Sequence, residues 1–316
     1  MQQVVIERFG DADVLVEQER DIPEPGPGEV VVQVAGAGLN PIDWKTRRGL
    51  GFAAEKLASH LPWVPGYDLS GVVVSVGLGE SRFVPGDRVM GMIGFPLGGG
   101  ACATHARVRA DELIAVPEAV DLVDMGGVPL AALTAWQCLF EVGRVAPGAK
   151  VLIHAGAGGV GHFAVQFARL RDAHVIATAS THNLDFVDGL GAHEVIDYTH
   201  DDFVDACYGL DFVLDLVGGE VGRRSLHTLG EHGMLVTVPT ASARAIIESA
   251  EALDLEATGM LVHPDLEHLE AILDLLVTGD AKVHVQQRFP LAQMSQAHRL
   301  LEQGHVRGKL VISPRD

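Results

Sequence analysis

The sequence predicts an α/β protein with a β-rich part and a doubly wound parallel sheet, and three observations lead to this fold class. Short β-branched runs separated by turn residues fill residues 1–120. From about 121 to 263, apolar strands alternate with helical segments, which predicts right-handed βαβ crossovers and a parallel sheet covered on both faces. A glycine-rich turn at 150–161 joins the first of these strands to a helix.

The β-rich part is predicted from its strands and turns. Residues 30–34 and 72–76 are valine-rich runs bounded by glycine and proline, a composition typical of strands. Segments 23–28 and 84–87 read as tight turns, because proline fixes φ and glycine permits a positive φ. Many short strands with turns at this spacing predict a partly closed β-barrel.

The second part and the tail follow in order. Its strands are predicted at 151–153, 175–177, 194–196, 212–214 and 235–238. After it, leucines and isoleucine at helical spacing predict a helix over 266–276. A strand at 283–285, a helix over 290–302 and a strand at 310–312 are predicted to close the chain. This tail has no linker composition, so we expect it to dock on a part already formed.

The charge balance excludes several classes of function. The chain of 316 residues has 42 acidic and 23 basic side chains, a net charge of −19. Such a chain is repelled by phosphate backbones and anionic lipid, which argues against nucleic-acid and membrane-surface roles. We interpret the excess acid as a solvated surface that maintains solubility.

The cysteines and apolar runs predict a cytoplasmic protein. Cys102, Cys138 and Cys207 lie far apart, which fits neither a disulfide framework nor a thiolate zinc cage. Charged residues interrupt the first ten positions, so no signal peptide is expected. The longest apolar run, 128–140, is too short for a bilayer, which needs about 20 residues.

The glycine-rich turn predicts a dinucleotide site of the Rossmann type. An apolar strand leads into Gly156-x-Gly158-x-x-Gly161, and an amphipathic helix follows. Gly156 allows the tight turn, Gly158 lets the backbone approach a pyrophosphate, and Gly161 lets helix and strand pack closely. The predicted cofactor-binding residues of this turn are Gly156, Ala157, Gly158, Gly159, Val160 and Gly161.

The end of the next strand favours NADP(H) over NAD. NAD sites usually place an acid about 20 residues after the glycine turn, where it binds the ribose 2′-hydroxyl. Residues 177–183 hold no acid and several small hydroxyl groups, which can donate to a 2′-phosphate. His182 is a candidate weak cation there, or equally an exposed loop histidine.

With these motifs in order, the chain resembles the medium-chain dehydrogenase/reductase superfamily, and within it the zinc-lacking quinone oxidoreductase (ζ-crystallin-like) branch. The resemblance covers essentially the whole chain. It implies a GroES-like barrel domain from 1–120 and 264–316, a Rossmann domain from 121–263, and a nicotinamide held in the cleft between them. The motifs that carry it lie at 38–43, 64–71, 85–89, 133–135, 155–161 and 308–311.

The resemblance also predicts chemistry without a metal. Zinc alcohol dehydrogenases of the superfamily have a cysteine where Asn40 stands, a histidine where Tyr67 stands, and a cysteine or acid within the segment 129–132. Without a Lewis acid, an isolated alkoxide is poorly stabilised, whereas a quinone or enone accepts hydride as a delocalised phenolate or enolate. Conjugated carbonyls are therefore the expected substrates.

Two catalytic residues are predicted, each with a structural alternative. The resemblance places Asn40 toward the nicotinamide and substrate, but Asn40 before Pro41 and Asp43 also reads as a helix N-cap. Asp43 reads as a cap or a support for that loop. Tyr67 could donate to a developing enolate, or be an aromatic that fills the space vacated by the metal.

Other residues are predicted around the cofactor. Thr134 matches the family threonine near the nicotinamide, although a mid-helix hydroxyl could instead bond its own backbone. Ser180 and Tyr198 match residues beside the 2′-phosphate. Lys309 recurs in the family, and the sequence alone places it at the surface.

These observations predict an NADPH-dependent, zinc-independent oxidoreductase that reduces quinones or related activated carbonyls. One alternative is an enoyl or alkenal double-bond reductase. An alternative of another class is an NADPH-binding sensor or structural protein without turnover. The resemblance also implies an oligomer, expected as a homodimer: the apolar strand around 257–262 at the sheet edge could pair with its copy across a two-fold axis.

Overall fold

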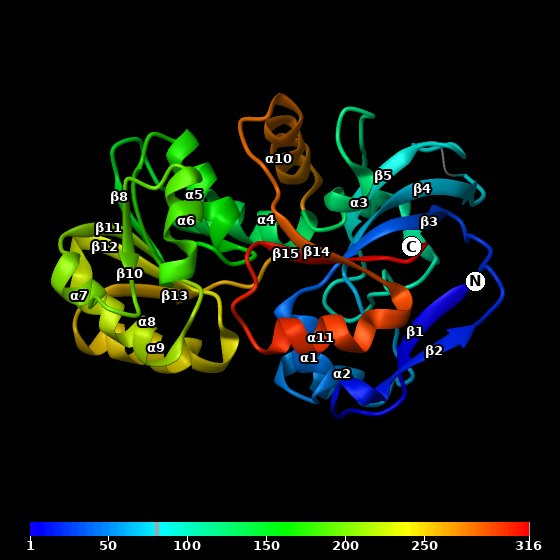
Figure 1. Cartoon of the computed structure of the whole chain (residues 1–316), viewed down its shortest axis with the longest axis horizontal. Helices are drawn as coiled ribbons and strands as arrows, with labels where there is room; N and C mark the ends of the chain where they lie inside the picture. Colours follow the sequence, from blue (N-terminus) through cyan, green and yellow to red (C-terminus); the bar gives the residue numbers. More distant parts are fainter. Residues whose placement is uncertain (80–81, 316) are drawn as a thin grey trace. The chain divides into compact units, whose positions relative to one another are not determined.

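The computed structural model describes residues 1–79 and 82–315. The chain divides into two compact units, Met1–Leu133 with His263–Asp316, and Thr134–Val262 (Figure 1). Compactness places residues 121–133 with the first unit. The domain limits at 120 and 263 drawn from the sequence stay a prediction.

A mostly antiparallel sheet forms the centre of the first unit, in the order β14-β15-β3-β4-β5-β7 with β6 paired to β3. Its strands are β3 (Glu29–Gly38), β4 (Asp68–Val76), β5 (Arg88–Met92), β6 (His105–Arg109), β7 (Leu113–Ala115), β14 (Val285–Pro290) and β15 (Lys309–Ser313). A separate pair is formed by β1 (Gln2–Ile6) and β2 (Leu15–Glu19). The two valine-rich runs predicted as strands lie within β3 and β4.

The C-terminal tail completes this sheet. β15 pairs antiparallel with β3, so the tail docks on the β-rich part already formed. The strand predicted at 283–285 is displaced, because β14 begins only at Val285 and continues to Pro290. The physical reason is its partner: β14 forms where it pairs in parallel with β15, and no local pattern in the sequence shows where that partner lies.

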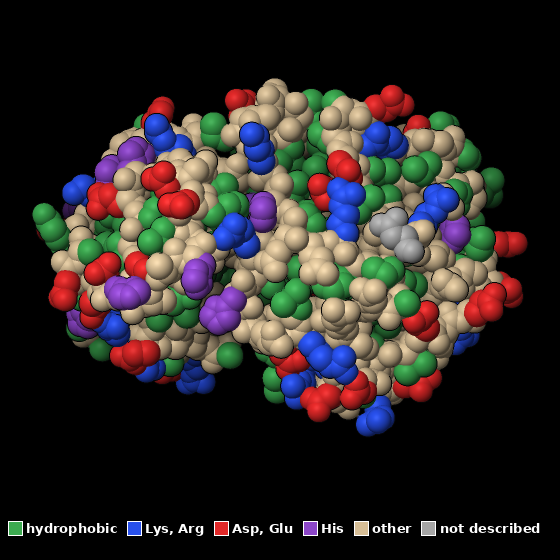
Figure 2. Space-filling model, viewed as in Figure 1, with side chains coloured by type: hydrophobic (Ala, Val, Ile, Leu, Met, Phe, Trp, Pro, Cys, Tyr) green, Lys and Arg blue, Asp and Glu red, His purple; other side chains and the backbone are tan. Residues whose placement is uncertain are grey.

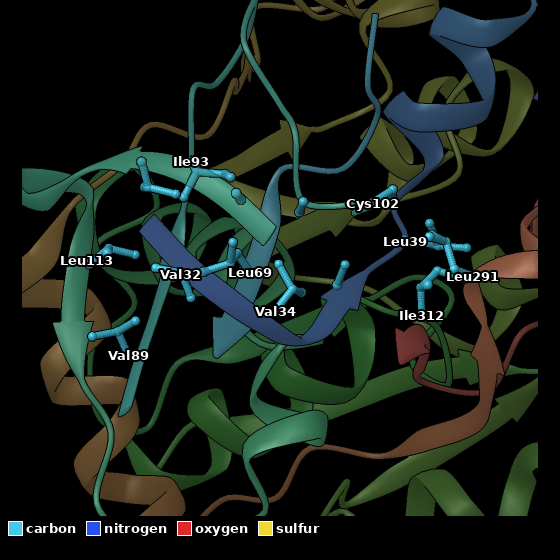
Figure 3. Close-up of a cluster of buried hydrophobic side chains, with 14 of the residues drawn as sticks. Val32, Val34, Leu39, Leu69, Val89, Ile93, Cys102, Leu113, Leu291 and Ile312 are labelled. Atoms are coloured by element: carbon cyan, nitrogen blue, oxygen red, sulfur yellow. The ribbon is translucent and has the colours of Figure 1, made fainter. Parts of the chain in front are cut away.

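Aliphatic side chains from the tail and the sheet share one core. Val32 and Val34 of β3 and Leu69 of β4 belong to the same buried cluster as Leu291 and Ile312 of the tail (Figure 3). Burial of each such side chain contributes about 1.5–3 kcal/mol. Core packing and strand pairing therefore both hold the tail on the sheet.

The helices of the first unit surround this sheet. They are α1 (Pro41–Arg47), α2 (Gly51–Leu57), α3 (Leu122–Met125), α10 (Leu266–Thr278) and α11 (Met294–Glu302), with single turns η1 (Ala12–Val14), η2 (Ala110–Glu112) and η6 (Leu291–Gln293). α10 covers the helix predicted over 266–276, and η6 with α11 covers the one predicted over 290–302. The units divide within α4 (Pro129–Trp136), which the π-helical turn η3 (Gln137–Val142) follows.

The second unit is a six-stranded parallel sheet in the order β10-β9-β8-β11-β12-β13. Its strands are β8 (Lys150–Ile153), β9 (His174–Ala179), β10 (Glu194–Asp197), β11 (Leu210–Asp215), β12 (Leu229–Thr237) and β13 (Glu256–Gly259). The order runs outward in both directions from β8 and β11. This is the doubly wound topology that the alternation of strands and helices predicts, with its switch point between β8 and β11.

Helices connect these strands and cover the sheet (Figure 1). They are α5 (Gly161–Leu170), α6 (Leu184–Gly189), α7 (Phe203–Ala206), α8 (Gly219–Ser225) and α9 (Thr240–Ala252), with short turns η4 (Thr181–Asn183) and η5 (Leu226–Thr228). β13 lies at one edge of the sheet. It ends at Gly259, earlier than the predicted edge strand at 257–262.

The surface mixes charges of both signs. Figure 2 shows acidic and basic side chains interspersed over the face in view. Within residues 1–79 and 82–315, no helix is both long and apolar enough to cross a membrane.

Candidate active site

The glycine-rich turn lies between β8 and α5, at the switch point of the parallel sheet. A Cβ built on Gly161 would lie 2.1 Å from the carbonyl oxygen of Ala155. Glycine at this position therefore lets the helix approach the strand, as predicted. Gly156 donates its N–H to the Thr178 carbonyl oxygen at 2.9 Å, which ties the turn to β9. The helix N-terminus so placed suits a pyrophosphate.

A buried histidine supports this turn, and the sequence reading missed it. His154 directly follows β8, and its Nδ1 and Nε2 lie 3.2 Å from Thr178 Oγ1 and 2.8 Å from Ser225 Oγ. Thr178 Oγ1 also accepts the N–H of Ala155, the next residue of the turn. Burial lowers the pKa of His154 to about 4, against the opposing effect of Asp215. A neutral imidazole therefore links β8, β9 and α8; its position between strand and glycines was the available signal.

Ser180 and Tyr198 lie at the carboxyl ends of the neighbouring strands β9 and β10. Asp197 is the register partner of Ala179, and Tyr198 donates its N–H to the Ala179 carbonyl oxygen at 3.1 Å. Ser180 Oγ accepts from the Asn183 side chain at 3.1 Å, and Tyr198 is exposed. The strand pairing thus brings the two predicted residues to one edge of the sheet; their contact with a 2′-phosphate stays a prediction.

An acid that the sequence reading did not consider lies at the same edge. The Asp197 carboxylate accepts hydrogen bonds from Thr181 Oγ1 at 2.5 Å and from Thr199 Oγ1 at 2.6 Å, and His200 Nδ1 lies 3.1 Å away. These bonds lower the pKa of Asp197 well below its usual range. The lack of an acid is therefore limited to the end of β9. The next strand supplies a carboxylate whose oxygen atoms are occupied by hydroxyl groups.

In the first unit, the side chain of Asn40 lies between two buried charges. Asn40 follows β3 and precedes α1, and its Nδ2 donates to Asp68 Oδ2 at 2.9 Å. Its Oδ1 accepts from the Lys309 ammonium. Asp68 Oδ1 accepts the N–H of Leu130 at 2.6 Å, which connects the group to the start of α4. We call Asn40, Asp43, Asp68 and Lys309 the buried polar cluster.

Lys309 corrects the sequence interpretation, which placed it at the surface. Its side chain is only 2% exposed, and Nζ lies 3.4 Å from Asp68 Oδ2. Leu39 donates its N–H to the carbonyl oxygen of Leu310, so pairing of the C-terminal strand carries Lys309 to Asn40. Burial lowers the pKa of Lys309, and Asp68 opposes that shift. A lone lysine after a glycine gives no local sign of such a partner.

Asp43 supports the loop before α1, as predicted. Its Oδ2 accepts the Asn40 N–H at 2.8 Å, and its Oδ1 accepts the Gly66 N–H at 3.1 Å. Burial raises the pKa of this carboxyl to about 7, with a smaller contribution from the charge of Asp68. Asp43 therefore fixes the backbone on both sides of the site, at Asn40 and beside Tyr67.

Tyr67 is fully buried and packs between two aromatic rings. The ring centroids of Trp63 and Phe95 lie 5.9 and 5.3 Å from that of Tyr67. Its hydroxyl donates to the Pro96 carbonyl oxygen at 3.1 Å. Burial raises the pKa of Tyr67 above its usual value. This environment matches the space-filling alternative, and the role of Tyr67 as a donor to substrate stays a prediction.

Two further expectations concern Thr134 and a metal. Thr134 lies in α4 at 2% exposure, and its contact with the nicotinamide stays a prediction. Across the described ranges, no group of three or more His, Cys, Asp or Glu side chains is placed to hold a metal ion.

The fold and the site define a class: a dehydrogenase with a β-rich unit and a nucleotide-binding parallel sheet. Two family descriptions match the chain, "Alcohol dehydrogenase GroES-like domain" at residues 26–118 and "Zinc-binding dehydrogenase" at residues 190–312. The predicted GroES-like and Rossmann fold is thereby confirmed.

Similarity to known proteins over nearly the whole chain defines the family. A chloroplastic quinone-oxidoreductase homolog of Spinacia oleracea is 31% identical, over 96% of this chain and 95% of that protein. The structure of the quinone oxidoreductase from Coxiella burnetii is 40% identical with a TM-score of 0.96, over 99% of both chains. The Escherichia coli quinone oxidoreductase, solved with NADPH, is 26% identical with a TM-score of 0.88, over 99% of this chain and 100% of that one.

The chain therefore belongs to the quinone oxidoreductase branch of the medium-chain dehydrogenase/reductase superfamily. It is an NAD(P)H-dependent oxidoreductase, and the predicted family and enzyme class are confirmed.

Proposed function

We propose that the protein transfers a hydride from NADPH to quinones or other conjugated carbonyls, and that it does so without a metal ion. The buried polar cluster carries this proposal. Asn40 and Tyr67 stand at two positions where zinc enzymes of the superfamily have zinc ligands. In this chain Asn40 donates a hydrogen bond to Asp68, and Tyr67 donates one to the Pro96 carbonyl oxygen. The Lys309 ammonium donates to Asn40. The positive charge of Lys309, held against the Asn40 side chain, repels a divalent cation from that position.

The residues of the second unit fit a dinucleotide. The turn at 156–161 is so tight that a Cβ on Gly161 would lie 2.1 Å from the Ala155 carbonyl oxygen, and it leads into the N-terminus of a ten-residue helix. Backbone N–H groups there bind the pyrophosphate. Bound NADPH supplies the hydride. Ser180 and Tyr198, adjacent at the sheet edge, bind the 2′-phosphate, while the hydroxyl groups of Thr181 and Thr199 occupy the oxygen atoms of the Asp197 carboxylate.

The substrate class follows from the charge that hydride transfer creates. A conjugated acceptor spreads that charge over a ring or an enolate, so hydrogen-bond donors are sufficient to stabilise it. Asn40 Nδ2 carries two N–H donors: one bonds Asp68 at 2.9 Å, and the other, 3.4 Å from the Gly38 carbonyl oxygen, is the one that we assign to the substrate. Water or a side chain supplies the proton.

The test is NADPH oxidation by purified protein with a 1,4-benzoquinone and with a linear 2-enal, each repeated with NADH. Turnover of the quinone with NADPH, unaffected by a chelator, is expected. Enal turnover without quinone turnover would identify a double-bond reductase. NADPH binding without turnover of either would favour the sensor, and loss of activity on chelation would refute the metal-free reaction.

We further propose a cytoplasmic homodimer that pairs through β13. This strand lies at one edge of the parallel sheet, and an edge strand can pair with a second copy. The three cysteines are free and buried, which suits a reducing compartment. Light scattering that shows only monomer would refute the dimer, and cell fractionation tests the compartment.

A further inference from the structure

Lys309 is a buried cation with no part in the reaction as proposed so far. Its side chain is 2% exposed and that of Asp68 is fully buried, with 3.4 Å between Nζ and Oδ2. A buried ammonium is unfavourable unless it is paired and hydrogen-bonded. The second hydrogen-bond partner of this ammonium is Asn40, a predicted catalytic residue.

The two charges determine the orientation of the Asn40 carboxamide. Oδ1 faces the Lys309 ammonium, which only donates, and Nδ2 faces the Asp68 carboxylate, which only accepts. A flipped carboxamide would turn its NH2 toward the ammonium and its oxygen toward the carboxylate. Both contacts would be repulsive. Asp43 holds the backbone N–H of the same residue at 2.8 Å, so main chain and side chain are both fixed.

We propose that Lys309 is a positioning residue for hydride transfer: together with Asp68 it holds the Asn40 carboxamide in one orientation. The inference rests on the proposed function, which places Asn40 at the nicotinamide and substrate. A group already oriented before the reaction needs no reorganisation as charge develops. Lys309 acts through Asn40 rather than on the substrate.

A purely structural ion pair would join β15 to β4 and do nothing else, so the test must separate stability from orientation. Lys309→Met alone leaves the Asp68 carboxylate buried without its cation. The double variant Asp68→Asn/Lys309→Met removes both charges. The amide introduced at position 68 can donate or accept, so the Asn40 carboxamide can take either orientation.

The kinetic readout is the division of the effect between kcat and KM. We expect the double variant to recover most of the melting temperature that Lys309→Met loses, while its kcat with a quinone falls about tenfold or more. The KM for the quinone should change less than the kcat. Lys309→Arg keeps a hydrogen-bond donor and a positive charge at this position, so it should retain part of the kcat that Lys309→Met loses.

A binding readout is independent of turnover. NADPH carries a nicotinamide, whereas 2′,5′-ADP contains only the adenosine half with its 2′-phosphate. The double variant should bind NADPH several-fold more weakly and bind 2′,5′-ADP as the wild type does. A double variant with wild-type kcat and a wild-type ratio of the two affinities would overturn the inference.

The two proposals fail separately. If the wild type reduces no acceptor, the proposed function is lost, yet the ratio of NADPH to 2′,5′-ADP affinity still decides whether Lys309 acts at the nicotinamide end. If the wild type reduces quinones and the double variant does so equally well, only the role of Lys309 is lost.

Discussion

The glycine turn of the second unit and the buried polar cluster of the first unit are assembled in different ways. The turn comes from one continuous segment, 154–161, and its key requirement is the absence of a side chain at Gly161. The cluster combines residues from positions 40, 43, 68 and 309, and its requirement is mutual compensation of buried charges.

The difference shows how each region tolerates change. A backbone cradle binds through N–H groups that every residue except proline has, so substitutions matter mainly when they fill space. A buried charged cluster depends on each partner, because removal of one leaves the others unpaired. Removal of one charge from the buried polar cluster should therefore have a larger effect than a substitution in the glycine turn.

The largest effect is expected when one charge of the cluster is removed. Lys309→Met should lower the free energy of unfolding by about 3–5 kcal/mol, because Asp68 stays buried without a cation. Asp68→Asn/Lys309→Met should lose much less. Urea titrations of both variants measure the difference, and equal losses would contradict the view that compensation holds the cluster together.

The next effect concerns pH and the support of the glycine turn. The folded-state pKa of His154 is lowered to about 4, so the unfolded chain takes up this proton at higher pH than the folded chain. His154 therefore contributes roughly 3 kcal/mol to the free energy of unfolding. This contribution is fully present above pH 6.5 and is lost as the pH falls toward 4.

His154→Gln should therefore make the free energy of unfolding less dependent on pH between 6.5 and 4. Urea unfolding at several pH values checks this. Equal slopes for variant and wild type would show that His154 is not held neutral, and that the turn does not depend on this network.

A substitution in the glycine turn should have a smaller effect on stability and a clear one on cofactor binding. Gly161→Ala places a Cβ 2.1 Å from the Ala155 oxygen, so the backbone must shift. This shift should lower the free energy of unfolding by about 1–3 kcal/mol. NADPH affinity should fall at least tenfold. Gly158→Ala, whose Cβ would lie 3.2 Å from the same oxygen, is the matched control for stability and should lower the free energy of unfolding much less. Equal losses of stability in the two variants would contradict this account.

The smallest effect is expected at Tyr67, where it separates two alternatives. Tyr67→Phe removes the bond to the Pro96 oxygen but keeps the packing on Trp63 and Phe95, a loss of about 1 kcal/mol. If Tyr67 only fills space, quinone turnover stays near that of the wild type. A fall of a hundredfold or more in kcat would establish the hydroxyl as a proton donor.

The parts of the fold that the sequence predicted are those with local signals. The strands of the parallel sheet, the glycine turn and the helix at 266–276 were all placed from periodicity and turn chemistry. The strand near 283 was displaced, because its limits depend on pairing with β15. The pairing of β9 with β10 brings an acid, Asp197, to the edge at which the end of β9 holds none.

The sequence by itself determined the two-part α/β architecture, the nucleotide-binding turn and the family, since each depends on residues that are neighbours along the chain. Only the tertiary structure decided the environment of Asn40. Lys309 reaches it from a position 269 residues away, through strand pairing and core packing. The physical reason is that burial of a charge depends on the partners that folding brings together, and neither hydropathy nor spacing encodes them.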